Sequence, residues 1–208
     1  MIKAFIFDIG NVLLRFDFSI AMGRLAQRMD PISAEVLASI EPIKIAYESG
    51  QLDRPNFLQR LGEVISYTGT EPEFVSAWED IFSENTPMIE IVEALHGHYP
   101  LYLLSNTSDL HVNFIFRKFP VFGLFEDAVY SFRVKSMKPS TEIFEKAIQQ
   151  FGVTPSETVF IDDLAPNVAT ARELGFHAIQ YDPADHGAFV HELDLLHVRR
   201  EFQREISA

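Results

Sequence analysis

The chain has 208 residues, of which 47% are hydrophobic and 23% are charged, a mixture that is typical of globular proteins and excludes a fibrous or largely disordered chain. Its formal net charge is −13 at pH 7 and its pI is near 4.9, which argues against nucleic acid or an anionic membrane as the main partner, because the overall field would repel both. At this length the chain can form one core domain with a sizeable insertion.

The chain begins with an apolar run, 2–7, that predicts a buried strand. The interval 13–100 that follows has no strand pattern but carries several helix starts. These starts are Asp17, Pro55, Thr70 with Glu73, and Thr86 with Pro87. Residues 15–85 are therefore predicted to form a helical insertion, the cap, and residues 1–14 and 86–208 the core domain. Aromatic residues expected in the interior of the cap, one or two of which could touch a substrate, are Phe16, Phe18, Tyr47 and Trp78.

Four more short apolar runs follow, separated by segments with helical spacing. The runs are 101–104, 128–132, 158–161 and 176–181. The helical segments are 108–119, 140–151 and 166–174, and the last two end at Gly152 and Gly175, where glycine commonly terminates a helix. Repeated alternation of strand and helix predicts right-handed βαβ units. The predicted fold class is α/β, a Rossmann-like parallel sheet with helices on both faces and an inserted α-helical cap. The segment 187–206 is expected to pack one helical face on this core.

Polar side chains follow the predicted strands at their carboxyl ends, where ligands bind in open α/β sheets. They are Asp8 after the first run, Ser105, Asn106 and Thr107 after the second, Lys135 and Lys138 after the third, and Asp162 with Asp163 after the fourth. Each has an ordinary explanation when taken alone, such as capping the next helix. Their order at successive strand ends favours one shared site.

Carboxylates gathered in one crevice repel one another unless a cation neutralises them. The chain has no cysteine, so thiol catalysis is excluded and a metal must be held by oxygen or histidine ligands. A set of carboxylates suits Mg²⁺. Hydroxyl, lysine and backbone N–H groups bind phosphate oxygens, and an aspartate can accept a phosphoryl group. The pattern predicts a Mg²⁺-dependent phosphoaspartate site.

Four segments, FDIGNV, LLSNTS, MKPSTEIF and VFIDDLAPN, resemble in this order the four motifs of the haloacid dehalogenase (HAD) superfamily, over essentially the whole chain. The insertion after the first motif resembles the C1 cap of that superfamily. Within it, YESGQLDRPNFLQRL, together with DIGNV, is similar to the branch that contains bacterial α-D-glucose-1-phosphate phosphatase and, less closely, the phosphatase domain of soluble epoxide hydrolases. The resemblance implies a HAD-like phosphoric monoester hydrolase that acts on a small phosphorylated metabolite such as a sugar phosphate.

The resemblance also implies catalytic and substrate-binding roles. Asp8 would be the nucleophile, forming an aspartyl phosphate that water then hydrolyses. Ser105 and the backbone N–H of Asn106 would bind the phosphoryl oxygens. Lys138, distinguished from Lys135 by the proline that follows it, would neutralise charge on Asp8 and on the phosphoryl group.

The metal ligands implied by the resemblance are Asp8, the carbonyl oxygen of Gly10 and Asp163. Asp162 is the alternative to Asp163, although many relatives have glycine or glutamate at its position. Asn167, four residues beyond Asp163, would support the metal shell from the following helix.

The sequence departs from the family pattern at Gly10. Most phosphatases of the superfamily carry a second aspartate there, which protonates the leaving oxygen and later activates water. General acid catalysis contributes roughly 10²–10⁴-fold, so its loss should be felt most with poor leaving groups. We expect an enzyme that either favours good leaving groups, such as an anomeric sugar oxygen, an acyl phosphate or an aryl phosphate, or recruits an acid from the cap or the substrate.

Three other functions compete with the phosphatase. In a 2-haloacid dehalogenase, Asp8 would attack carbon without a metal. The first motif of that branch resembles Asp-x-Tyr-Gly-Thr, which differs from DIGNV in this chain. A phosphomutase depends on the acid that is missing at Gly10. A catalytically impaired phosphate-binding module would retain the site without turnover. Because the sequence shows neither a leader nor an apolar run of about 18 residues, we expect a soluble, cytoplasmic protein; self-association remains open.

Overall fold

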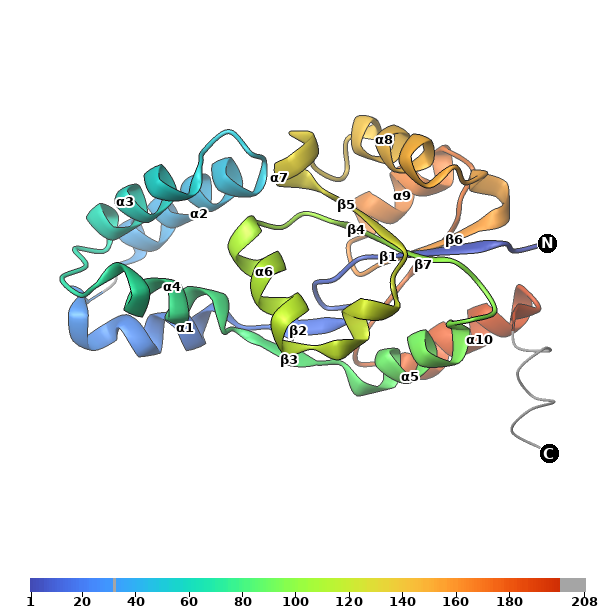
Figure 1. The fold of residues 1–208 in the computed structure, drawn as a ribbon, viewed down its shortest axis with the longest axis horizontal. Helices are drawn as coiled ribbons and strands as arrows, with labels where there is room; N and C mark the ends of the chain where they lie inside the picture. Colours follow the sequence, from blue (N-terminus) through green and yellow to red (C-terminus); the bar gives the residue numbers. More distant parts are fainter. Residues whose placement is uncertain (32, 199–208) are drawn as a thin grey trace.

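The computed structural model of the protein describes residues 1–31 and 33–198. At its centre is a five-stranded sheet with the order β5-β4-β1-β6-β7, in which all neighbours are parallel (Figure 1). The strands are β1 Ala4–Phe7, β4 Leu101–Ser105, β5 Asp127–Tyr130, β6 Thr158–Asp162 and β7 His177–Gln180. All five apolar runs therefore form strands, and the predicted α/β fold is confirmed.

Helices cover both faces of the sheet, because successive strand residues point to opposite faces and both sets are apolar. In β1, Phe5 and Phe7 belong to one core cluster and Ile6 to the other. The first face is covered by α5 Thr86–Leu95, α6 Asp109–Lys118 and α10 His186–Leu195, and the second by α8 Thr141–Phe151 and α9 Ala165–Glu173. Short turns complete the core: α7 Ser131–Val134, η2 Pro120–Leu124 and η3 Pro155–Glu157.

Four helices form the cap, on the left of Figure 1. They are α1 Phe18–Leu25, followed by the turn η1 Ala26–Arg28, then α2 Ala34–Glu48, α3 Arg54–Val64 and α4 Glu71–Glu79. Asp17 caps α1, and Pro55 lies in the first turn of α3. Thr70 and Glu73 form a capping box at the start of α4. These three starts agree with the sequence, whereas α2 was not predicted, because it carries Pro42 in its interior, where proline usually breaks a helix.

The cap helices form a hydrophobic cluster around Trp78, which also includes Leu110 of α6. Tyr47 stacks on Phe57 with 4.1 Å between ring centroids, and Phe57 packs against Trp78 at 5.3 Å. Phe18 is partly buried against Trp78. Phe16 differs from the expectation, since its side chain is 40% exposed and lies outside this core.

A short antiparallel ribbon joins the cap to the core. Its strands are β2 Leu14–Phe16 and β3 Phe82–Glu84, with Leu14 opposite Glu84. The expectation that 13–100 contains no strand is wrong at these two places, because strands of 3 residues are too short to show alternation. The proposed cap, 15–85, begins inside this ribbon and ends one residue after it.

The C-terminal helix α10 packs on the core through Phe189 and Leu193. The helix expected over 187–206 ends at Leu195, earlier than expected, and residues from 199 onward lie outside the described residues. Among the helices that are described, none combines the length and apolar character needed to cross a membrane.

Candidate active site

The polar residues that follow separate strands in the sequence meet at the carboxyl edge of the sheet. Because β1 lies between β4 and β6, the strand ends that carry Asp8, Ser105 and Asp162 are neighbours. Lys138 reaches the same place from the loop after α7. A carboxylate oxygen of Asp163 also lies near those of Asp8 and Asp162. The crossover topology thus brings together side chains from four parts of the chain.

Lys138 is the central group of this site. Its buried Nζ lies 2.9 Å from Asp8 Oδ1 and 2.6 Å from Asp162 Oδ2, and it donates to the Leu104 carbonyl at 2.8 Å. The ammonium donates hydrogen bonds to Asp162 and Leu104, whereas its contact with Asp8 is an ion pair that leaves the buried Asp8 Oδ1 without a hydrogen-bond partner among the described residues. Lys135, in contrast, is exposed at the end of α7, so the structure places Lys138 and not Lys135 against the aspartates.

Burial and charge both shape the ionisation of the site. Burial raises the pKa of Asp8 from 3.8 to about 6, against the opposing effect of Lys138 and of a hydrogen bond from Ser105, while Asp162 adds to the increase. Burial alone would lower the pKa of Lys138, but the carboxylates of Asp8 and Asp162 outweigh it and the pKa is raised. The lysine therefore stays charged and favours the ionised form of Asp8.

The two adjacent aspartates have different surroundings. Asp162 is fully buried, and its oxygens accept from Lys138 Nζ, from the Leu164 backbone N–H at 2.9 Å and from Asn167 Nδ2 at 2.9 Å. Asp163 is partly exposed and its Oδ2 accepts from Asn11 Nδ2 at 3.0 Å. Asn167 thus holds Asp162, and the hydrogen bond to Asp163 comes from Asn11, which the sequence analysis did not consider.

The donor set fits a hard divalent cation. One carboxylate oxygen each of Asp8, Asp162 and Asp163 lies within 4.8 Å of the others. Asp162 is fully buried with both oxygens hydrogen-bonded, whereas Asp163 is partly exposed, so we expect Asp8 and Asp163 to be the carboxylate ligands of Mg²⁺. The family resemblance adds the Gly10 carbonyl to this expected set. In the part of the chain that the structure describes, no backbone N–H donates to the Gly10 carbonyl.

Ser105 and Asn106 lie at the end of β4, beside Asp8. Ser105 is buried, with 2% of its surface exposed. The Asn106 side chain makes two hydrogen bonds with the backbone of Lys138, donating to its carbonyl at 2.9 Å and accepting from its N–H at 2.8 Å. The sequence predicted only a backbone role for Asn106, and the structure adds a side chain that fixes the loop carrying Lys138.

A cavity of about 120 Å³ lies between this site and the cap. From the core it is lined by Ile9, Gly10, Ser105, Asn106, Thr107, His111 and Ile115, and from the cap and ribbon by Phe16, Phe18, Lys44, Glu48, Ile81 and Phe82. Its walls combine apolar and polar side chains, and the cap contributes one cation, Lys44, and one carboxyl group, Glu48. A group attached to a phosphate at Asp8 would occupy this cavity.

Sequence reasoning did not single out Lys44, Glu48 or His111. Helix α2 was not predicted, so no face of it could be assigned to the site. Glu48 did carry one signal, since it is the last residue of α2 and an acidic side chain is disfavoured at the negative end of a helix dipole. A residue placed against that preference suggests a role other than helix stability.

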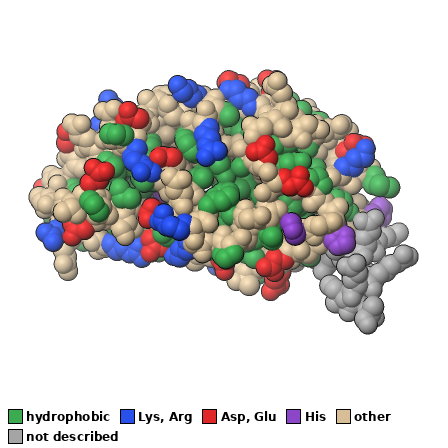
Figure 2. Space-filling view, in the orientation of Figure 1, with side chains coloured by type: hydrophobic (Ala, Val, Ile, Leu, Met, Phe, Trp, Pro, Cys, Tyr) green, Lys and Arg blue, Asp and Glu red, His purple; other side chains and the backbone are tan. Residues whose placement is uncertain are grey.

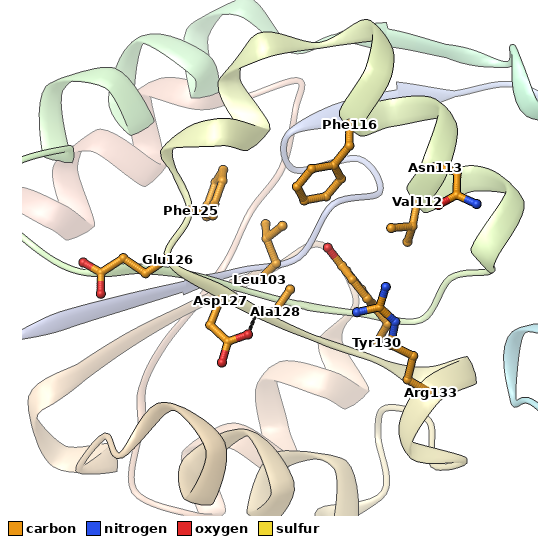
Figure 3. A pocket seen from close by; sticks show the side chains of 10 residues that line it. All are labelled: Leu103, Val112, Asn113, Phe116, Phe125, Glu126, Asp127, Ala128, Tyr130 and Arg133. Atoms are coloured by element: carbon orange, nitrogen blue, oxygen red, sulfur yellow. Dashed lines mark hydrogen bonds between the residues drawn. The ribbon is translucent and has the colours of Figure 1, made fainter.

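A second, more open hollow lies at the edge of the sheet. Figure 2 shows acidic and basic side chains interspersed over one face, with hydrophobic side chains gathered near its centre. The groove of about 380 Å³ in Figure 3 runs between α6 and β5, with Phe116 and Phe125 on one side and Arg133 beside Tyr130 on the other. Its charged groups are one arginine and two separate carboxylates, Glu126 and Asp127, and it shares no residue with the aspartate cluster. It is larger than the cap cavity but has no group of three potential metal ligands among the described residues.

Known proteins resemble the chain along most of its length. It is 27% identical to the D-ribitol-5-phosphate phosphatase of Bacteroides thetaiotaomicron over 195 residues, which cover 86% of this chain and 92% of that protein. A solved HAD-family enzyme from the same organism, in complex with magnesium and inorganic phosphate, superposes with a TM-score of 0.76 at 26% identity, covering 88% of this chain and 96% of the other.

A HAD-like family hydrolase from Porphyromonas gingivalis gives a TM-score of 0.77 at 27% identity and covers 93% of this chain and 98% of its own. The family model of haloacid dehalogenase-like hydrolases matches residues 2–175. The chain belongs to the haloacid dehalogenase-like hydrolase family.

Proposed function

We propose that this protein is a Mg²⁺-dependent phosphatase that hydrolyses a small phosphorylated metabolite, such as a sugar phosphate, through an aspartyl phosphate. The observation that carries the proposal is the buried Lys138 between Asp8 and Asp162, with Asp163 alongside. This arrangement offers a nucleophilic carboxylate, a fixed cation and a metal site within one crevice. The relative named for D-ribitol-5-phosphate supports a sugar-alcohol or sugar phosphate as the class of substrate.

Each residue has a distinct part in the reaction. An oxygen of Asp8 attacks phosphorus, so that the new bond joins aspartate to the phosphoryl group as the bond to the leaving oxygen breaks. The Ser105 hydroxyl and the backbone N–H of Asn106 hold the phosphoryl oxygens, and Lys138 neutralises their charge. Mg²⁺, held by Asp8, Asp163 and the Gly10 carbonyl, supplies further charge neutralisation to the phosphoryl oxygens when bound. Water then cleaves the aspartyl phosphate and restores Asp8.

The proposal is tested by assaying the wild type and Asp8→Asn against a panel of phosphorylated sugars and sugar alcohols, together with p-nitrophenyl phosphate. We expect phosphate release that requires Mg²⁺, stops with a chelator and is lost in Asp8→Asn. Turnover that survives this substitution would refute the mechanism. Halide release from 2-haloacids without Mg²⁺ would show a dehalogenase. Binding of beryllium fluoride with Mg²⁺, but no hydrolysis of any substrate, would show a phosphate-binding module.

A further inference from the structure

The position of the missing acid is filled by an aromatic ring. A Cβ atom added to Gly10 would lie 3.0 Å from Cε1 and 3.4 Å from Cδ1 of Phe16. The first of these contacts is tighter than normal van der Waals contact, so a side chain at residue 10 requires the Phe16 ring to shift by a few tenths of an ångström. Because residue 10 is glycine, no side chain there can supply a proton, and a proton for the leaving oxygen has to come from another wall of the cavity.

Glu48 is the carboxyl group on the opposite wall. It lines the same cavity as Gly10, Ser105 and Asn106, and it is partly buried at the end of α2. It does not belong to the cluster of carboxylates that surrounds the metal site. Its side chain thus lies on the cap side, where the leaving group of a phosphate attached at Asp8 would be.

The backbone at the end of α2 is tied to the core. Ser131, which is fully buried, donates to the Glu48 carbonyl at 2.5 Å and accepts from the Thr107 N–H at 2.9 Å. Two residues after Glu48, Gly50 has φ +70°, and a Cβ there would lie 2.3 Å from the Phe132 carbonyl oxygen. Glycine therefore permits a close approach of α2 to the core, and this approach fixes where Glu48 stands relative to the phosphate-binding loop.

The other two polar groups from this part of the cavity are poorer proton donors. The Lys44 ammonium is paired with Glu41 at 2.8 Å, so that carboxylate already engages it. Burial lowers the pKa of His111 to about 4, and its Nε2 lies 3.2 Å from the Trp78 carbonyl. His111 is therefore neutral at neutral pH, and its Nε2 is engaged by the Trp78 carbonyl. This leaves Glu48 as the carboxyl donor.

The charges around Glu48 favour a proton on it. Burial raises the pKa of Glu48 from 4.5 to about 7; Lys44 opposes this effect, while Glu41 and Asp8 add to it. His111, which faces the cavity from α6, is uncharged. A general acid works best when its pKa lies near the working pH, and Glu48 meets this condition.

We propose that Glu48 is the catalytic acid and base of this enzyme and takes the place of the aspartate absent at residue 10. The proposal rests on the phosphatase function proposed above. As the phosphorus–oxygen bond to the leaving group breaks, the Glu48 carboxyl transfers its proton to that oxygen, which departs as an alcohol. In the second step the Glu48 carboxylate takes a proton from the water that attacks phosphorus, so that phosphate is released, Asp8 is restored and Glu48 is protonated again.

The test compares kcat/KM of the wild type and Glu48→Gln on two kinds of substrate, one with a good leaving group and one with a poor one. They are p-nitrophenyl phosphate and the best primary-alcohol phosphate of the panel. We expect a loss of about 10²–10⁴-fold on the alcohol phosphate and of less than about tenfold on p-nitrophenyl phosphate, whose phenolate needs no acid. The limb of the wild-type pH profile that reports the acid should also disappear in Glu48→Gln. The matched control is Glu35→Gln, an exposed glutamate in the first turn of the same helix, which should match the wild type on both substrates.

Several outcomes would overturn the assignment of Glu48. They are equal losses on the two substrates, no loss on either, or a wild type that hydrolyses p-nitrophenyl phosphate but no alcohol phosphate. In each of these cases an inactive Asp8→Asn would still support the nucleophile. If Asp8→Asn retains activity, it is the proposed function that fails, so the two failures are distinguishable. Thermal unfolding of both glutamate variants separates a catalytic loss from a folding defect.

Discussion

Replacing Lys138 with methionine tests whether the buried ion pairs hold the site together. The change removes the ammonium that contacts Asp8 and Asp162 at 2.9 and 2.6 Å and leaves a fully buried carboxylate without its counter-charge. Breaking a buried pair in this way costs about 3–5 kcal/mol, a large part of a typical total stability of about 5–15 kcal/mol. For a chain of this size, about 2–4 °C are lost per kcal/mol, so we expect the melting temperature of Lys138→Met to fall by about 6–20 °C.

The assay is urea and thermal unfolding in the presence of a chelator, so that no cation replaces the ammonium. Lys138→Met combined with Asp162→Asn should regain more than half of the loss, because asparagine keeps the oxygen that accepts from Leu164 and Asn167 but carries no charge. Lys135→Met is the matched control and should stay within about 0.5 kcal/mol of the wild type. A Lys138→Met protein as stable as the wild type, or a double variant no more stable than the single one, would refute the reasoning.

Three further predictions concern the carboxylates and the ring beside them. In metal-free protein, stability should fall as the pH rises from about 4.5 to 7, because the folded state binds the Glu48 proton more tightly than the unfolded chain does. This increase in pKa corresponds to at most about 3.4 kcal/mol, and urea unfolding across this range should show a smaller slope for Glu48→Gln. Asp163→Asn should weaken Mg²⁺ binding, measured by calorimetry, by more than about tenfold with little loss of stability. Asp162→Asn should instead lower the melting temperature. The reverse pattern would show that Asp162 is the metal ligand and Asp163 the structural residue. Gly10→Asp should destabilise the protein by less than about 1 kcal/mol, because the 40% exposed Phe16 ring can shift to relieve the contact, and Phe16→Ala in the same chain should remove most of that penalty in thermal unfolding.

The parts of the site that could be predicted from the sequence are those that depend on local patterns. Apolar runs fix the strands, and a parallel sheet places all its carboxyl ends at one edge, so Asp8, Ser105 and Lys138 could be grouped before any contact was known. The contact between Asn11 and Asp163 joins residues 152 positions apart, and no periodicity indicates it.

The different roles of Asp162 and Asp163 depend on which way each side chain points, since both residues are aspartates. Neighbouring side chains at the end of a strand point to opposite sides, and the sequence does not say which of two aspartates faces the interior. The role of Glu48 depends in the same way on tertiary structure, since Gly50 and Ser131 set the approach of α2 to the core. These contacts join the cap to the core, and no local pattern in the sequence of either part predicts them.

Because of the β2–β3 ribbon, the stability of the core depends only weakly on the length of the cap. Since Leu14 and Glu84 are register partners, the chain leaves and re-enters the core at neighbouring points. For the core, the whole cap is therefore one loop whose two ends are held together. The entropy of closing such a loop grows slowly, by about 0.6 kcal/mol for each doubling of its length. Helices can therefore be gained, lost or exchanged in the cap at little entropic cost, and the residues that meet the leaving group can diversify while Asp8 and Lys138 keep their places.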